Sequence, residues 1–326
     1  MPPGQRLIGY ALLAALAIML QSWLLPADDS MKTAAQHVVA PAPALQVPVK
    51  QPFGLTRELA DLEGQVKKQC VNPRLRAGTF VVDPATGMYV DVNGTQAFAA
   101  ASIIKVPVLV KLLVAIDNKA VSPDQLVTLR SDLIAGGSGF LQWRPLDSTV
   151  SVREAAELMI TNSDNTATNL IIDLLGGKDA CNTDFALWGL TQTQINNMLP
   201  DFEGTNKTSP YDLSYLLGKI EQGALISKES RQFMYRIMSH VRTRTLLPMG
   251  LGPGAKISHK TGDIASMVGD AGIVTTPAGR RYIVAVQVER PRNDQRGNKL
   301  IREISKLVYQ YMTADAAPVA RAPTKK

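Results

Sequence analysis

Two patterns of apolar and polar residues, one with helical spacing and one typical of strands, divide the chain into segments. Apolar residues recur at helical spacing from residue 55 to 69, which predicts an amphipathic helix. Two short apolar runs, at 78–83 and 88–92, flank turn-forming residues at 84–87 and predict a β-hairpin. From residue 102 to about 235 the spacing is mostly helical, so a block of helices follows the hairpin.

The C-terminal part returns to strand-like patterns. Three runs, at 255–262, 268–276 and 281–289, precede a predicted final helix at 294–312. Consecutive strands joined by short connections favour antiparallel pairing. The simplest architecture is therefore an α+β fold: an antiparallel five-stranded sheet built from both ends of the chain and flanked by the terminal helices, with an inserted all-α lobe. A cleft between sheet and lobe is a natural place for an active site.

Local signals divide the helical block further. Ser151 and Glu154 form a capping box that predicts a helix start. A glycine pair, Gly176-Gly177, predicts a helix end. Residues 190–208 show no periodicity and predict a long loop, and long loops in compact domains are often functional.

The two ends of the chain differ from this folded body. Residues 7–25 are apolar and uncharged and follow Arg6, which predicts a membrane anchor or signal segment after a cytoplasmic N-terminus. We favour an uncleaved anchor over a cleaved signal peptide, because residues 26–29 offer no small-residue cleavage site. Both interpretations place the body outside the cytoplasm, in the periplasm or at the cell surface. The predicted segments are a cytoplasmic N-terminus at 1–6, an anchor or signal at 7–25, an Ala/Pro-rich linker at 26–52, a folded domain at 53–312 and a disordered tail at 313–326.

Composition narrows the classes of function. The 326 residues are 45% hydrophobic, which is enough to build a large core. The net charge is +7, but the flanks 1–52 and 313–326 hold six bases and three acids, which leaves +4 on the body. A nucleic-acid-binding protein needs a clustered basic face, so we expect no nucleic-acid partner. With two cysteines and three histidines, we expect neither a metal site nor a cofactor.

Cys70 and Cys181 leave two alternatives open. An oxidising compartment allows a disulfide between them. We favour two buried, reduced thiols, because nothing in the sequence brings their Cα atoms together.

A candidate nucleophile precedes the apolar run VPVLVKLL. Ser102 and Lys105 are spaced so that a helix beginning there places both side chains on one face. A neutral lysine amine can accept the serine proton, and N–H groups at a helix start can stabilise developing negative charge. The alternative is a serine helix cap beside a solvated lysine.

Two polar triplets add to this pair. Ser163-Asp164-Asn165 separates two helical patterns, and Lys260-Thr261-Gly262 ends a predicted strand. Separately, each is compatible with an ordinary turn. Together, in the order SxxK, SDN and KTG, they match the signature of serine acyl-transfer sites in penicillin-recognising enzymes.

On these triplets the chain resembles the class A β-lactamases and their penicillin-binding relatives. The segments ELMITNSDNTATNLI and HKTGDIASMVGDAGIV are similar to those that surround SDN and KTG in these enzymes. The resemblance covers roughly residues 55–312 and implies their fold and a serine acyl-enzyme mechanism.

The resemblance also implies catalytic roles. Ser102 would attack the substrate carbonyl and become acylated, and Lys105 would accept its proton. Ser163 would relay a proton to the leaving nitrogen, and Lys260 would support Ser163 electrostatically. The backbone N–H groups of Ser102 and Asp263 would form the oxyanion hole.

Substrate binding is implied in the same way. Thr261, together with the lysine before it, would hold the substrate carboxylate, and Gly262 completes the triplet beside it. Asn165 would position Lys105 and the substrate amide, and Asn196 matches a substrate-binding asparagine of the family's long loop. His259 precedes the KTG triplet, but strand alternation turns it to the other face, so we expect it to be structural.

The long loop departs from the family pattern. In class A β-lactamases it supplies a glutamate, four residues before an asparagine, that activates the deacylating water. Here Ile195-Asn196 matches the family's Leu-Asn pair and Gln192 occupies the glutamate position, while Glu203 is out of register. A neutral amide accepts no proton near pH 7, and losing a general base costs about 10²–10⁴ in rate.

The Arg–Asp ion pair that closes this loop in the family is also missing. Leu190 occupies the arginine region, and Asn206 or Lys207 the aspartate region. The sequence TGDI, which contains Asp263, resembles the penicillin-binding protein A type, a class A-like group that lacks the loop glutamate and resembles D-Ala-D-Ala peptidases.

Three functions follow from these patterns. The favoured one is an anchored, monomeric penicillin-binding or DD-peptidase enzyme, acylated by β-lactams or D-Ala-D-Ala peptides, with slow release of the β-lactam adduct. The first alternative is a class A β-lactamase that deacylates by another route. The second is an inactive peptidoglycan-binding module, which the intact SxxK, SDN and KTG set disfavours.

Overall fold

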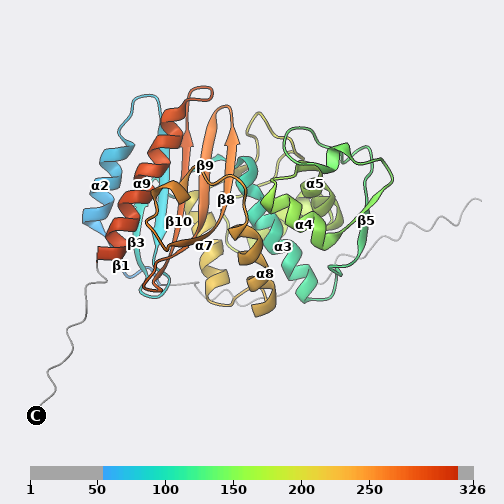
Figure 1. Ribbon diagram of the computed structural model, residues 1–326, viewed down its shortest axis with the longest axis horizontal. Helices are drawn as coiled ribbons and strands as arrows, with labels where there is room; N and C mark the ends of the chain where they lie inside the picture. The colour runs from blue at the N-terminus through green and yellow to red at the C-terminus, as the bar shows by residue number, and fades with distance from the viewer. Residues whose placement is uncertain (1–53, 315–326) are drawn as a thin grey trace, which may run out of the picture. The chain divides into compact units, whose positions relative to one another are not determined.

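The computed structural model describes residues 54–314 (Figure 1). The predicted N-terminus 1–6, anchor or signal 7–25 and linker 26–52 lie outside the described residues. Of the predicted tail, only residues 313 and 314 are described, and they end the last helix. None of the helices within residues 54–314 combines the length and apolar character needed to cross a membrane.

The main sheet confirms the predicted antiparallel five-stranded arrangement and adds one short strand. Its order is β1-β3-β2-β10-β9-β8, and only the outermost β1 pairs in parallel. A two-residue, exposed strand has no apolar alternation, so the sequence gives no signal for β1. The strands are β1 (Arg57–Glu58), β2 (Arg76–Val82), β3 (Met88–Val92), β8 (Lys256–Ile264), β9 (Met267–Thr275) and β10 (Arg281–Glu289).

The first helix begins later than its apolar spacing predicts. Helix α2 spans Ala60–Cys70 instead of beginning at residue 55, because the residues before it pair with β3. Leu62 and Val66, which the spacing assigns to the apolar face, are fully buried.

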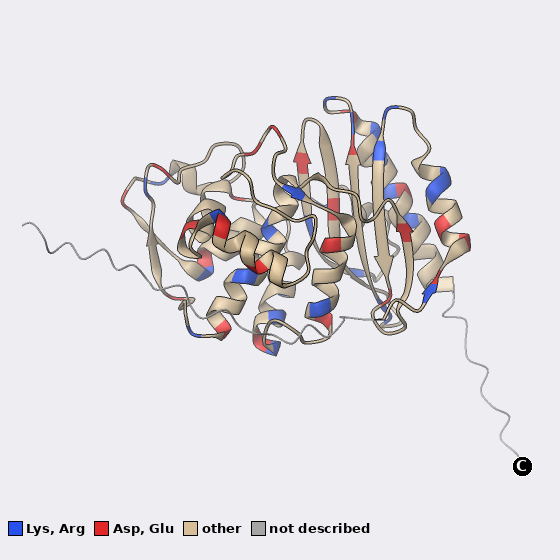
Figure 2. Ribbon diagram, turned by 180° about the vertical axis from the view of Figure 1, so that it is seen from behind, with Lys and Arg blue, Asp and Glu red and all other residues tan. Residues whose placement is uncertain are grey.

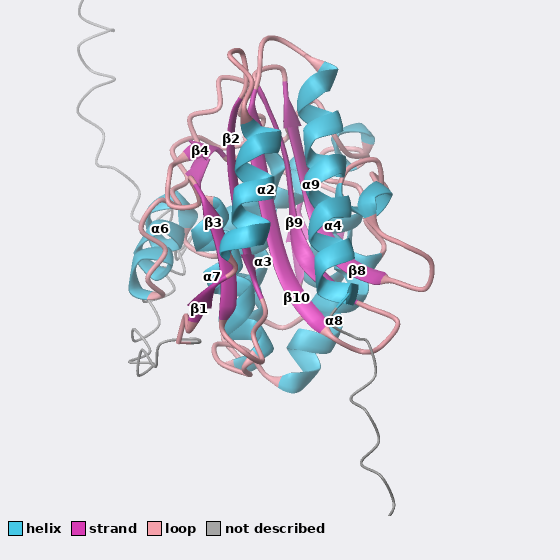
Figure 3. Cartoon of the chain, turned by 90° about the vertical axis from the view of Figure 1, so that its left-hand side faces the viewer, coloured by secondary structure: helices cyan, strands magenta, loops and turns pink. Residues whose placement is uncertain are grey.

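Helices α2 and α9 (Gln295–Ala314) lie side by side across one face of the sheet (Figure 3). Their apolar faces and the strands beneath form one core, which includes Val66, Val284, Ile301 and Ile304. Burying an aliphatic side chain of this size stabilises the fold by about 1.5–3 kcal/mol. This layer therefore fixes the sheet whose far edge carries β8.

The opposite face of the sheet packs against the helical lobe. Helix α7 contacts β10 and β2, and α8 contacts β8 (Figure 1). Helix α3 is buried along its first nine residues, Lys105 to Leu113, and lies at the centre of a second, larger core. The helices of this lobe are α3 (Lys105–Asp117), α4 (Val152–Thr161), α5 (Asn165–Leu174), α6 (Gly177–Leu187), α7 (Pro210–Glu221) and α8 (Lys228–Ser239).

The lobe is not wholly helical. Two small sheets interrupt it, β4 (Phe98–Ala99) with β7 (Lys207–Thr208), and β5 (Leu126–Thr128) with β6 (Thr149–Ser151). The capping box is realised, since the Ser151 side chain accepts a hydrogen bond from the Glu154 backbone N–H at the start of α4. Gly176 adopts φ +90°, a left-handed conformation that ends α5 and lets α6 begin.

Both cysteines are free, so the disulfide alternative is wrong. Cys181 is buried on α6, and Cys70 is half-buried at the end of α2. Burial raises the pKa of the Cys70 thiol to about 11, which keeps it protonated at neutral pH.

Charged residues of both signs are interspersed over the described elements (Figure 2). Many are paired across elements, as Arg130 is with Asp173 and Arg236 with Glu157. Exposed pairs of this kind contribute about 0–1 kcal/mol each, so they shape the surface more than they stabilise the fold.

Candidate active site

Ser102 lies in a short 3-10 helix, Ala101–Ile104, that runs directly into α3. Side chains three residues apart are eclipsed in a 3-10 helix, so Ser102 and Lys105 stack on one side. Their Oγ and Nζ atoms are 2.9 Å apart. The alternative of a solvated lysine is excluded, because Lys105 is fully buried.

The Lys105 amine lies within hydrogen-bond distance of oxygen atoms of three residues, namely Ser102, Ser163 and Asn165. Its Nζ lies 2.8 Å from the Ser163 carbonyl oxygen, 3.1 Å from Ser163 Oγ and 2.8 Å from Asn165 Oδ1. Burial lowers the pKa of Lys105 well below its usual value, and the charge of Lys260 lowers it further, while Asp164 opposes both effects. The amine can therefore reach the neutral form that a general base requires.

Ser163 stands between two lysines. It adopts φ +57° in the turn between α4 and α5, and its Oγ also accepts a hydrogen bond of 3.2 Å from Lys260 Nζ. Burial lowers the pKa of Lys260 to about 8, against the opposing charge of Asp270. Ser163 Oγ is therefore within reach of two amines that can exchange protons with it.

Asp164 is a positioning residue whose role is not evident from the SDN triplet alone. Its buried carboxylate caps α5 by accepting from Ala167 N, and it also accepts from Phe140 N at 2.6 Å and Leu141 N at 2.9 Å. Gly139 adopts φ +107° there, and a Cβ on it would lie 2.2 Å from the Asp164 side chain. An aspartate immediately before a helix is an N-cap signal, but the sequence contains no sign of the loop that it also holds.

Asn165 connects the loop at 136–141 to the cluster formed by the side chains of Ser102, Lys105, Ser163 and Lys260. Its Nδ2 donates to the Gly136 carbonyl oxygen at 2.9 Å, and its backbone N–H donates to Ser138 O at 3.0 Å. With Oδ1 bound to Lys105, the amide has one fixed orientation. Asn165 thus joins the lysine to the loop that borders the site.

Strand β8 forms the other wall and carries Thr261, Gly262 and Asp263 beside Lys260. A Cβ on Gly262 would lie 2.8 Å from Ile103 Cγ1, so glycine lets β8 approach the 3-10 helix of Ser102 closely. The Asp263 carboxylate is paired with Arg290, an interaction between segments 27 residues apart that no local motif predicts.

His259 lies behind this wall. Its Nδ1 is 2.9 Å from Asp270 Oδ1, and both side chains are fully buried between β8 and β9. Asp270 also accepts a hydrogen bond from Leu247 N. His259 therefore contacts the sheet interior instead of the Ser102 cluster.

Hydrogen bonds to the side chains of one asparagine and one aspartate hold the loop at 190–208 together. Asn206 is buried and accepts from the backbone N–H groups of Asn196 and Asn197. Asp201 accepts from the N–H groups of Thr205 and Asn206. Leu190, in the region where the family has its arginine, is buried, and these hydrogen bonds hold the loop together.

Gln192 and Asn196 are not joined to the cluster by hydrogen bonds. Asn196 Nδ2 donates to the Thr205 carbonyl oxygen at 2.7 Å, within the loop itself. Gln192 N donates to Asp212 Oδ2, and the residue lines a hollow of about 420 Å³ that faces Asn182 and Ala186 of α6. The sequence places both residues on the long loop, but the structure gives them contacts within the lobe.

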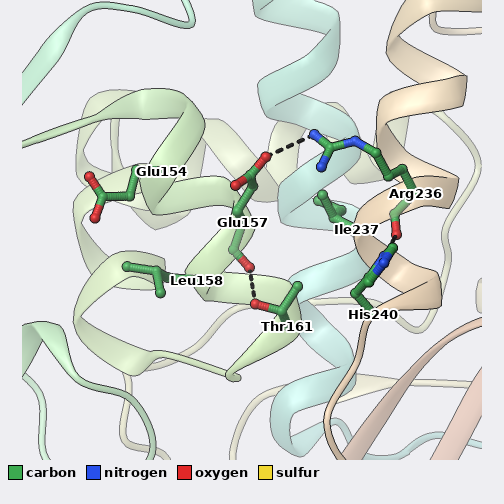
Figure 4. Close-up of a pocket in the computed structure, with 7 residues that line it drawn as sticks. All are labelled: Glu154, Glu157, Leu158, Thr161, Arg236, Ile237 and His240. Atoms are coloured by element: carbon green, nitrogen blue, oxygen red, sulfur yellow. Dashed lines mark hydrogen bonds and ion pairs between the residues drawn. The ribbon is translucent and has the colours of Figure 1, made fainter.

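A second hollow, of about 270 Å³, lies between α4 and α8 (Figure 4). Glu157 and Arg236 pair across it, and His240 Nδ1 lies 2.7 Å from the Arg236 carbonyl oxygen. Glu154, which also lines the hollow, pairs with Arg144 outside it. Nowhere within residues 54–314 do three or more His, Cys, Asp or Glu side chains gather as metal ligands would.

Solved structures of similar fold include penicillin-binding and β-lactamase proteins. PBP-A is 48% identical, with a TM-score of 0.79 over 80% of this chain and 99% of its own. A leucine-to-glutamate variant of PBP-A, in an acyl-enzyme complex with penicillin G, matches with a TM-score of 0.78 at 48% identity. A β-lactamase from Sphaerobacter thermophilus is 28% identical, with a TM-score of 0.70 over 78% of this chain and 97% of its own.

Curated relatives and a family model agree with the fold. The extended-spectrum β-lactamase PER-1 of Pseudomonas aeruginosa is 24% identical over 77% of this chain and 87% of its own length. A β-lactamase of Streptomyces fradiae is 27% identical over 78% of this chain and 87% of its own. The model of the beta-lactamase enzyme family matches residues 55–312, all but three of the residues 54–314 that the structure describes. The two-lobed α+β domain with its serine–lysine cluster is that of a class A β-lactamase, and the chain belongs to the beta-lactamase enzyme family.

Proposed function

We propose that this protein is a serine acyl-transfer enzyme of the penicillin-binding, DD-peptidase type. Its substrates would be D-Ala-D-Ala peptides, and β-lactams would acylate it as analogues of them. The observation that carries the proposal is the position of Lys105 Nζ, fully buried and within hydrogen-bond distance of both Ser102 Oγ and Ser163 Oγ. This arrangement links a nucleophile, a base and a proton relay in one contact.

The acylation step follows from these contacts. Neutral Lys105 accepts the Ser102 hydroxyl proton while Oγ forms a bond to the substrate carbonyl carbon. The carbon–nitrogen bond then breaks, and the nitrogen takes the proton of Ser163 Oγ–H. Ser163 recovers a proton from Lys105, so in net terms Ser102 loses one proton, the leaving nitrogen gains one, and Ser163 and Lys105 return to their starting protonation states. Protonated Lys260, beside Thr261, attracts the substrate carboxylate.

Slow deacylation is the second part of the proposal. Gln192 provides no carboxylate at the position where class A β-lactamases have their general base. The nearby Asp201 carboxylate is bound to two loop N–H groups. Without a positioned base, hydrolysis of the adduct is about 10²–10⁴ slower. This favours a long-lived adduct over efficient β-lactam turnover.

Labelling with a fluorescent penicillin tests both parts. The purified chain should take up one label on Ser102, identified by mass spectrometry, and keep it for many minutes after excess reagent is removed. The S102A variant is the control and should not be labelled. Rapid loss of label would support the β-lactamase alternative, and no adduct at all would support a peptidoglycan-binding module.

A charge substitution in the long loop tests the role of Gln192. Q192E supplies a carboxylate at the family's glutamate position and should shorten the lifetime of the adduct at least about tenfold. Q194E places the same charge on an exposed residue of the same loop and should leave the lifetime unchanged. Equal lifetimes in the parent, Q192E and Q194E would show that position 192 does not reach the acyl-enzyme.

We also propose that the enzyme acts outside the cytoplasm, held by residues 7–25 as an anchor. The apolar, uncharged character of this segment supports the proposal. Fractionation of cells that produce the full chain should find it with the membrane, whereas a chain beginning at residue 27 should stay with the cytoplasmic fraction. Recovery of the full chain as a shortened, released form would favour a cleaved signal peptide instead.

A further inference from the structure

Arg290 follows β10 and pairs with the carboxylate of Asp263, the residue directly after the KTG triplet. Within residues 54–314 it is the only partner of that carboxylate. Its side chain is 1% exposed, while the Asp263 side chain with which it pairs is 55% exposed. The same nitrogen, Nη2, also donates to the Ile264 carbonyl oxygen at 3.2 Å. Arg290 therefore binds the end of β8 through both a side chain and the backbone.

The other side of the guanidinium is anchored in α9. Nη1 donates to Asn298 Oδ1 at 2.6 Å and to the Asp294 carbonyl oxygen at 3.4 Å. The Arg290 backbone N–H donates to Ser266 O in the turn that joins β8 to β9. The planar Arg290 guanidinium forms hydrogen bonds on two sides at once and so connects the end of β8 to the start of α9. A lysine has a single amine nitrogen and could not make both sets of bonds.

The position of Asp263 gives this connection a chemical consequence. The family resemblance assigns the Asp263 backbone N–H to the oxyanion hole of the proposed acylation, so under the proposed function its carboxylate lies next to a site where negative charge develops. Burial raises the pKa of Asp263, and Arg290 lowers it. An unpaired carboxylate there would repel the oxyanion, and a mobile one would displace the N–H that should stabilise it.

We propose that Arg290 is a positioning residue for acylation, which fixes the end of β8 and neutralises the Asp263 carboxylate beside the oxyanion hole. The proposal rests on the proposed function, since it concerns the same reaction at Ser102. It differs from a purely structural role in one respect. The harm done by removing Arg290 depends on the charge of Asp263, so removing that charge should repair it.

The experiment measures the second-order rate of labelling by a fluorescent penicillin in the full-length chain, with a thermal unfolding curve for each variant. R290M should acylate about 10²-fold more slowly, as expected when a reacting group is displaced. R290M/D263N should recover most of this loss, measured against the rate of D263N alone. R76M is the matched control, because Arg76 pairs with Glu289, the residue before Arg290, by two hydrogen bonds.

The outcomes separate the alternatives. Parent-like acylation in R290M, or equal slowness in R290M and R290M/D263N when both are folded, would overturn the proposal. If R290M does not fold, R290Q and R290Q/D263N give the same comparison with a neutral side chain that still donates a hydrogen bond, and D263N must then speed acylation in the glutamine background. A parent chain that takes no label refutes the proposed function itself, a result distinct from any of these.

Discussion

The two buried lysines of the site have opposite requirements for their charge. Lys105 must be neutral to accept a proton, and Lys260 must be protonated to attract a carboxylate. Burial lowers the pKa of both, and the charge of Lys260 contributes to lowering that of Lys105. Asp270 raises the pKa of Lys260. The charge of Lys260 thus favours neutral Lys105, and the charge of Asp270 favours protonated Lys260.

The pH dependence of acylation should reflect this difference. Below the lowered pKa of Lys105 the base is protonated, so the labelling rate should rise as pH increases through that value. Above about pH 8 Lys260 loses its proton, and the rate should fall. Labelling rates measured from pH 5 to 10 test this, and a rate that still climbs at pH 10 would contradict it.

The charge of Asp270 should determine the pH above which the rate of acylation falls. Since its carboxylate raises the pKa of Lys260, D270N should lower that pKa and move the alkaline fall in rate to lower pH. H259N is the matched control, because it removes the other member of the buried pair and leaves the Asp270 charge in place. The labelling profile of each variant gives the midpoint, and equal midpoints in D270N and H259N would oppose the argument.

Site residues that are close together in the chain could be predicted from the sequence, whereas contacts between distant segments could not. Ser102 and Lys105 form a local pair, and the SDN and KTG triplets are short enough to recognise from their letters. The loop contacts of Asp164 and the pairing of Asp263 with Arg290 join segments that are 23 or more residues apart. Such contacts depend on the fold that brings the segments together, and no local spacing encodes them.

At the scale of elements, the turn between α4 and α5 organises the site. It presents Ser163 to both lysines, and its next two residues hold the loop at 136–141. Asp164 is at the centre because one carboxylate serves both a helix end and a loop. Its removal should therefore disturb stability and chemistry together.

D164A tests the importance of this turn. It leaves the Phe140, Leu141 and Ala167 N–H groups without their acceptor and should lower the free energy of unfolding by about 3 kcal/mol, since bonds to charged groups contribute more than neutral ones. Acylation should also slow, because Ser163 and Asn165 lose their support. Urea unfolding and penicillin labelling measure the two effects.

The matched control for D164A is S151A, the N-cap of α4. Loss of an ordinary cap costs about 1 kcal/mol. S151A should therefore destabilise the protein less and leave the labelling rate unchanged. An unfolding free energy for D164A as high as that of S151A would show that the loop bonds contribute little.

At the scale of the whole molecule, the sheet separates two cores and its edge forms part of the site. One core lies under α2 and α9, and the other fills the helical lobe. Ser102 and Lys105 come from the lobe side, whereas Lys260 comes from β8. The sequence predicts this division because both ends carry strand patterns, but two- and three-residue strands such as β1 and β5 are too short to show alternation.

This division predicts where the chain can be shortened. The two cores draw on residues between 59 and 312, so a chain of residues 54–314 should fold as a monomer and acylate at the full-length rate. Beginning at residue 60 instead removes β1 and Leu59, which is 4% exposed and whose N–H donates to Tyr89 O. That loss should cost about 2 kcal/mol, mostly from the buried leucine. Urea unfolding, light scattering and labelling of both chains test this. Equal stability of the two would show that β1 contributes nothing, and slower acylation by residues 54–314 would mean that the catalytic domain needs its N-terminal segment.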